Sequence, residues 1–325
     1  MSSAVARVAS NAGNRPASAD GDIGRQAGRD RNVRLQRARG YWSGTFRAMA
    51  SPCEFLTRTG SEARALCLAQ LVAAEAWRIE DKFSRYLSGN IVDAINSGNG
   101  RPVQVDLETA GLLDFAQTLY ALSDGRFDIS SGVLRRAWNF DGSDRLPTRV
   151  QVEDALRNVG WHRADWTPPT LRLQAGMQID FGGVAKEYAV DRAAKLVGTQ
   201  TRAGCMINFG GDLAVVGTAD NDGPWRVGIE SPLGDRPDPE RVINLYHGAL
   251  ATSGDARRYV IRDGVRYGHV LDALTGWPVI DAPRSITVAA DTCTQAGMLA
   301  TLAMLMGDEA EVFLGDQSIQ YWTVR

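Results

Sequence analysis

The apolar residues of this 325-residue chain are spaced for helices through much of its first half and mostly for strands after residue 200. Those between Leu68 and Tyr86 recur at helical spacing, and they predict a long helix that follows a capping box of Thr59 and Glu62. Further helices are predicted over residues 106–125, 149–159, 186–196 and 294–306.

Extended apolar runs predict strands over residues 41–58, 207–216, 225–229 and 285–290. The pair Asp263-Gly264 between two short apolar runs predicts a two-residue hairpin. Helices and strands do not alternate in repeated βαβ units. The predicted fold class is therefore α+β, with antiparallel sheets packed by helices, rather than a doubly wound parallel sheet.

The first forty residues contain eight arginines and three aspartates, a net charge of +5, and few large apolar side chains. Such a segment does not bury enough apolar surface to order itself, so a disordered Arg-rich tail is predicted over residues 1–40. Residues 41–325 are long enough to bury a large core and are predicted to form a single domain.

Composition argues against several classes of function. The net charge of −2 leaves the body of the chain acidic and without a broad basic face, so a nucleic-acid partner is not expected. No run of eighteen apolar residues and no secretory signal are visible, which predicts no membrane span and a cytoplasmic location. Four widely separated cysteines and three histidines argue against a zinc cluster and fit reduced thiols.

One segment has the pattern of a phosphate-binding turn. An apolar run ends at Asp180, the glycine pair Gly182-Gly183 follows, and Lys186 stands at the start of an amphipathic helix. Backbone N–H groups and the helix dipole favour negative charge at such a place. The same glycines are equally consistent with a turn that has no ligand, so both interpretations stay open on this pattern alone.

Four other segments combine glycines with polar side chains. They are Gly125 to Asp128, Asn208 to Asp212, Thr252 to Asp255, and Gly268-His269. Each is explained singly by a turn, a cap or a structural histidine. A histidine nevertheless titrates near neutrality, which suits it to proton transfer when it is well placed.

Taken together and in order, these segments resemble the ApbE family of flavin transferases, the FAD:protein FMN transferases. The resemblance runs from about Phe46 to the C-terminus. It rests on Met49 with Pro52-Cys53, Gly125 to Ile129, Trp138-Asn139-Phe140, Asp180 to Asp191, Asn208 to Asp212, Thr252 to Asp255, and His269 to Gly276. It implies a T-fold-like α+β architecture.

The resemblance also implies an activity and its partners. Family members bind FAD and cleave its pyrophosphate. They attach FMN through a phosphoester to a Thr or Ser hydroxyl of a target flavoprotein and release AMP, usually with Mg²⁺. By position, the expected contacts to FAD are Met49, Tyr86, Arg126, Phe127, Asp128, Asp180, Lys186 and Leu271. His269 matches the family's histidine near the reacting phosphate and is the expected catalytic residue.

The metal site that the resemblance implies is incomplete in this chain. Its expected ligands are the carbonyl of Gly183 together with Ala300 and Thr301, but Gly297 stands where the family has an Asp. Mg²⁺ usually requires at least one carboxylate, so a weak or atypical site is expected. By resemblance alone, Gly297→Asp is expected to tighten metal binding. Glu187, which replaces a family glycine, and Asp255 are alternative sources of a carboxylate.

These departures leave three functions open. The first is FMN transfer, the second is a flavin-binding or carrier protein that lost catalysis, and the third is an FAD diphosphatase that gives FMN and AMP. Gly268 stands where many members have a second histidine, which leaves His269 alone for proton transfer. Either a monomer or a homodimer is compatible with the sequence.

Overall fold

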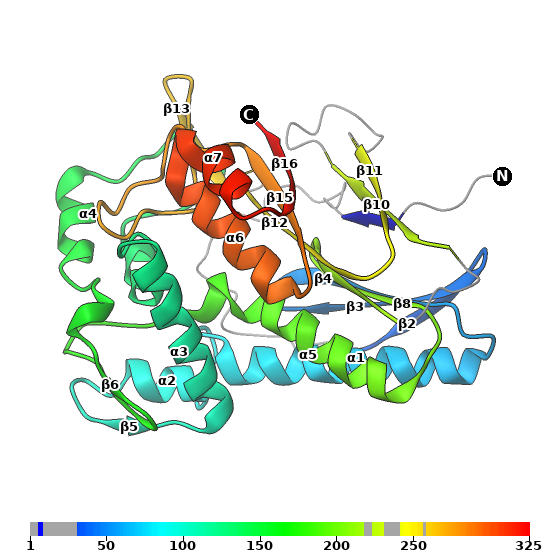
Figure 1. Cartoon of the computed structure of the whole chain (residues 1–325). Coiled ribbons are helices and arrows are strands. Elements are labelled where there is room, and N and C mark those ends of the chain that lie inside the picture. Colours follow the sequence, from blue (N-terminus) through cyan, green and yellow to red (C-terminus); the bar gives the residue numbers. More distant parts are fainter. Residues whose placement is uncertain (1–5, 9–30, 218–222, 231–240, 256–257) are drawn as a thin grey trace.

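The computed structural model describes residues 6–8, 31–217, 223–230, 241–255 and 258–325 (Figure 1). Its centre is an eight-stranded sheet in the order β16-β15-β12-β9-β8-β4-β3-β2, in which every neighbouring pair is antiparallel. The strands are β2 (Arg34–Ala38), β3 (Tyr41–Ala48), β4 (Ser51–Thr57), β8 (Cys205–Phe209), β9 (Asp212–Val216), β12 (Gly248–Gly254), β15 (Ser285–Ala290) and β16 (Gln320–Val324).

Three helices cover one face of this sheet: α1 (Glu62–Phe83), α5 (Ala185–Gln200) and α6 (Cys293–Met306). In Figure 1, α1 and α5 run side by side below the strands, and α6 lies over β12 and β15. The main core fills the space between them, with Phe55, Phe209 and Ile286 from the sheet fully buried. This layer brings the starts of α5 and α6 close to the strands that carry the glycine-rich motifs.

Smaller elements surround this core. A three-stranded sheet is formed by β1 (Ala6–Val8), β10 (Trp225–Ile229) and β11 (Arg241–Leu245). Its strands β10 and β11 add apolar side chains to a second cluster with Leu56 and Met206. The other elements are α2 (Ile91–Asn96), β5 (Val103–Gln104), α3 (Leu107–Leu122), α4 (Arg149–Leu156), β6 (Asp165–Thr167), β7 (Thr170–Arg172), β13 (Tyr259–Arg262), β14 (Val265–Gly268) and α7 (Ala310–Asp316). Within the described ranges, no helix combines the length and apolarity needed to cross a membrane.

The predicted α+β class with antiparallel sheets and packed helices is confirmed, with two local corrections in this part of the chain. The first helix is capped by Ser61, whose Oγ accepts a hydrogen bond from the Arg64 N–H, rather than by Thr59. The extended run 207–216 is two strands, because Gly210 and Gly211 have positive φ values of 64° and 105° and form a hairpin turn. Only glycine fits at residue 210, where a Cβ would lie 2.8 Å from the Ser51 side chain.

The predicted disordered tail is wrong for Arg34–Ala38, which pair with β3 as the edge strand β2. This strand is stabilised by backbone hydrogen bonds and by the Arg37 guanidinium, which lies 4.6 Å from the centre of the Trp42 ring. A count of apolar side chains detects neither the backbone hydrogen bonds nor the contact between Arg37 and Trp42. The strand β1 also falls inside the predicted tail, and residues 1–5 and 9–30 lie outside the described residues.

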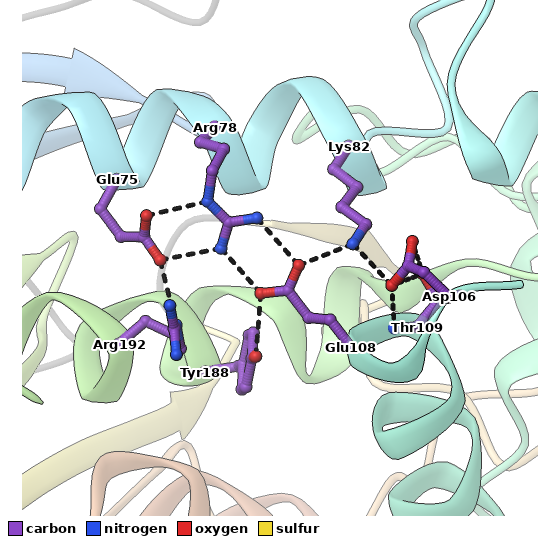
Figure 2. Close-up of polar contacts among 8 residues, drawn as sticks. All are labelled: Glu75, Arg78, Lys82, Asp106, Glu108, Thr109, Tyr188 and Arg192. Atoms are coloured by element: carbon purple, nitrogen blue, oxygen red, sulfur yellow. Dashed lines mark hydrogen bonds and ion pairs between the residues drawn. The ribbon is translucent and has the colours of Figure 1, made fainter.

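A charged network fixes α5 against α1 and α3 (Figure 2). Arg78 on α1 bonds both Glu75 and Glu108 at 2.7–2.8 Å. Glu108 on α3 also accepts from Lys82 at 2.7 Å and from the Tyr188 hydroxyl of α5 at 3.0 Å. Because Tyr188 lies two residues after Lys186, the network also positions the start of α5.

Glu108→Gln is expected to lower the free energy of unfolding by about 2 kcal/mol at neutral pH and by less at pH ~3. The hydrogen bonds from Arg78, reinforced by Lys82 and Tyr188, lower the pKa of Glu108 from 4.5 to about 2. Its stabilisation is therefore complete above the unfolded pKa of 4.5 and is lost as the pH falls toward 2. Urea unfolding of the wild-type protein and of Glu108→Gln at both pH values measures this effect. The same difference in unfolding free energy at both pH values would contradict the lowered pKa of Glu108. Glu153→Gln, in an exposed ion pair with Arg149, is the matched control.

Candidate active site

The turn between Asp180 and α5 is shaped by the aspartate itself. Asp180 Oδ1 accepts a hydrogen bond from the Gly182 N–H at 2.9 Å, and the Asp180 N–H donates to the Ile129 carbonyl at 2.9 Å. Its Oδ2 lies 3.4 Å from Arg85 and 3.3 Å from Arg135. The turn is therefore tied to the segment that follows Asp128, and the guanidinium groups of Arg85 and Arg135 pair with the Asp180 carboxylate at its border.

Lys186, in the first turn of α5, is held by a buried partner. Its Nζ lies 2.7 Å from Asp212 Oδ2, and Asp212 Oδ1 accepts from the Thr252 N–H at 3.1 Å. Burial lowers the pKa of Lys186, but the carboxylates of Asp212 and Glu187 outweigh it, so the pKa is raised. The ammonium is thus a fixed positive charge. Its side chain is 29% exposed, which leaves room for a second, anionic partner.

His269 follows β14 and is held neutral. Its Nδ1 is buried without a hydrogen-bond partner among the residues that the structure describes, and its ring packs edge-on against Phe140. Burial first, then the charge of Arg258 and smaller contributions from Lys186 and Arg135, lower the pKa of His269 to about 4. A neutral ring nitrogen without a partner is chemically able to accept a proton.

The NMR signal of His269 is expected to stay in its neutral position from pH ~8 to pH ~5, whereas an unperturbed histidine titrates near 6.5. The chain has only three histidines, so His269→Ala assigns the signal directly. A titration midpoint near pH 6.5 for His269 would show that its ring is more exposed to water than it is in the structure.

Other predicted FAD contacts adjoin this turn. Phe127 packs on Gly183, where its ring would lie 3.4 Å from an added Cβ. Arg126 donates to the Leu305 carbonyl at 3.0 Å and lies 3.9 Å from Asp272, next to Leu271. These contacts join the turn, the loop after His269 and the end of α6.

Asp128 is buried next to Phe127, and its role as an FAD contact stays a prediction. Its carboxylate is buried and accepts from the Ser130 and Trp161 N–H groups, both at 2.7 Å. Burial nevertheless raises its pKa. Both side-chain oxygens are already used by the protein, so the side chain organises the loop that presents Phe127.

Met49, Tyr86 and Leu271 lie at the edges of this group. Met49 lies in the β3–β4 turn and has a positive φ of 51°. This turn lies beside the turn at Gly210, because the Gly210 N–H donates to the Pro52 carbonyl at 2.9 Å. Tyr86 is 62% exposed and has the Arg135 guanidinium 5.3 Å from its ring centre. Leu271 is half-buried and pairs with Pro278.

The three expected metal ligands do not make a carboxylate site. Thr301 Oγ1 lies 3.0 Å from Ser253 Oγ, Ala300 is buried in α6, and Gly183 lies under Phe127. In the described part of the chain, no group of three or more His, Cys, Asp or Glu residues is arranged to hold a metal. Asp255 is already paired with Arg266 at 3.0 Å and Arg284 at 3.2 Å, so its carboxylate is occupied.

Two arginines of the site were not predicted. Arg85 and Arg135 both approach Asp180, and Arg85 also donates to the Gly132 carbonyl at 2.8 Å. The Arg135-Arg136 pair after Leu134 was a visible signal in the sequence. Arg85 follows a helix and gave no local signal, because only tertiary packing brings it to the turn.

The start of α5 thus combines a lysine, a turn bordered by Arg85 and Arg135, and a neutral histidine within the electrostatic range of Lys186. A family model described as the ApbE family matches residues 49–321, and the chain belongs to this family. The FAD:protein FMN transferase of Vibrio cholerae is 30% identical over 236 residues, which cover 71% of each chain. The FAD:protein FMN transferase of Treponema pallidum is 31% identical, covering 66% of this chain and 65% of the relative.

Solved structures agree. The ApbE protein of Thermotoga maritima superposes with a TM-score of 0.78 at 30% identity, over 87% of this chain and 94% of its own. The flavinyl transferase ApbE of Pseudomonas stutzeri, at 24% identity, has the same fold with a TM-score of 0.75 over 90% of this chain and 92% of its own.

Proposed function

We propose that this protein is an FAD:protein FMN transferase. It cleaves the pyrophosphate of FAD, joins FMN through a phosphoester to a Thr or Ser hydroxyl of a target flavoprotein, and releases AMP. The observation that carries this proposal is the fixed, partly exposed Lys186 at the start of α5 with the neutral His269 within its electrostatic range. The family membership and the names of the relatives support the same activity.

In this proposal, one set of residues binds FAD and another residue transfers the proton. Lys186 and the N–H groups at the start of α5 hold the diphosphate. The acceptor hydroxyl oxygen attacks the phosphorus of the FMN half, its proton passes to His269, and the bond to the AMP phosphate breaks so that AMP leaves as the anion. Met49, Tyr86, Phe127 and Leu271 are the proposed apolar contacts to the rings of FAD.

Mg²⁺ is the proposed metal, and when bound it would neutralise charge on the diphosphate oxygens. Gly183, Ala300 and Thr301 remain its proposed ligands, and a carboxylate is needed beside them. The cytoplasm is the proposed compartment, which the four free cysteines support.

The dependence of AMP release on an acceptor tests this function against its alternatives. The purified protein is incubated with FAD and Mg²⁺, with and without extract from the source organism, and AMP is measured. A transferase releases AMP only when the acceptor is present. Equal AMP release in both samples would indicate a diphosphatase, and bound FAD with no AMP in either sample would indicate a carrier.

A further inference from the structure

Helices α5 and α6 meet at Gly297, and the Glu187 side chain fills the space that a side chain at residue 297 would need. A Cβ added to Gly297 would lie 2.6 Å from Glu187 Cγ, 2.9 Å from its Oε1 and 3.0 Å from its Cδ. A side chain at residue 297 would therefore require the Glu187 side chain to move, and the carboxyl group of α5 occupies the space beside α6.

The Glu187 carboxyl group is incompletely paired. Its Oε2 is buried and has no hydrogen-bond partner in the described ranges. A buried carboxyl oxygen without a donor is costly unless something positive meets it.

Two residues with oxygen atoms that could bind a cation lie four positions in sequence from the contact between Glu187 and Gly297. Gly183 precedes Glu187 by four residues, and Thr301 follows Gly297 by four residues, so it lies on the same face of α6. The Thr301 hydroxyl is fixed by Ser253 at 3.0 Å. A carbonyl, a hydroxyl and one carboxylate are hard oxygen ligands of the kind that Mg²⁺ accepts when substrate phosphates complete its shell.

We propose that Glu187 supplies the carboxylate of a divalent-cation site between the start of α5 and the Gly297–Thr301 face of α6. The carboxylate comes from α5, and Gly297 provides the room for it. A single carboxylate beside neutral oxygens also explains why the described residues contain no cluster of acidic or histidine ligands. The proposal rests on the proposed function only for the diphosphate that would complete the coordination.

The test measures Mn²⁺ binding to the full-length protein from the electron paramagnetic resonance signal of the free ion. Glu187→Gln keeps the shape of the side chain and is expected to weaken Mn²⁺ binding by about tenfold or more.

Gly297→Asp alone is expected to weaken Mn²⁺ binding as well, because the new side chain collides with Glu187. This geometry reverses the expectation drawn from the resemblance. The double variant Glu187→Ala/Gly297→Asp moves the carboxylate to α6 and is expected to bind Mn²⁺ within about threefold of wild type.

Wild-type affinity in Glu187→Gln, or no Mn²⁺ binding by the wild-type protein at millimolar concentration, would overturn the proposal. Glu153→Gln, an exposed carboxylate in α4, is the matched control and should bind like wild type. FAD affinity is measured on the same samples by quenching of flavin fluorescence. Failure of the wild-type protein to bind FAD would count against the proposed function and leave the Mn²⁺ comparison valid.

Discussion

Replacing His269 with alanine is expected to lower the rate of AMP release with acceptor present by about 100-fold or more, the usual contribution of a general base. The affinity for FAD is expected to change less than about threefold, because the role proposed for His269 is proton transfer and its buried Nδ1 has no hydrogen-bond partner in the described residues. Initial rates and flavin fluorescence quenching measure the two effects separately.

The matched control is His162→Ala. His162 is exposed and its Nδ1 lies 3.1 Å from the Tyr120 hydroxyl, and its loss should leave the rate within about twofold. Equal losses of rate and FAD affinity in His269→Ala would make His269 a binding residue and would remove it from the proton-transfer step.

The second large effect is expected at Lys186. Lys186→Met removes a charged donor to the diphosphate and is expected to weaken FAD binding by about 30-fold, as the loss of a charge-assisted hydrogen bond does. It also leaves Asp212 unpaired with a side chain only 2% exposed, which is expected to lower the free energy of unfolding by about 3 kcal/mol.

A double variant separates these two consequences. Lys186→Met/Asp212→Asn removes the buried charge while its amide oxygen can still accept from the Thr252 N–H, so most of the stability should return. FAD affinity should stay low, because the phosphate donor is still missing. Urea unfolding and FAD titration of the single and double variants measure this. Recovery of FAD affinity in the double variant would show that Lys186 acts through folding alone.

The sequence predicted the parts of the fold that depend on local patterns. The long helices and the hairpin at Asp263-Gly264 follow from periodicity and turn chemistry, and each is present. The edge strand β2 was missed because its stability comes from backbone pairing with β3 and from Arg37 on Trp42, which apolar patterning does not report.

The site was predictable where a motif is continuous in sequence. Lys186 lies at the start of α5, and Asp180 shapes the turn before it, as the glycine pair and the helical spacing indicated, whereas the apolar run before Asp180 does not form a strand. The inward orientation of Asp128 and the approach of Arg85 depend on contacts with Trp161 and Asp180, more than thirty residues away. The packing of Glu187 on Gly297 joins two helices more than one hundred residues apart, and nothing local distinguishes it from an exposed Glu in a first helical turn.

Covalent labelling of an acceptor tests the central claim most directly. The purified protein is incubated with FAD and Mg²⁺ in an extract from a source-organism strain that lacks its gene, and the proteins are separated under denaturing conditions. A fluorescent flavin band is expected that carries the mass of one FMN less one water on a Thr or Ser, with one AMP released per label, and it should be absent with His269→Ala. AMP release without a covalent flavin band, or FAD binding with neither product, would contradict the assignment as an FMN transferase.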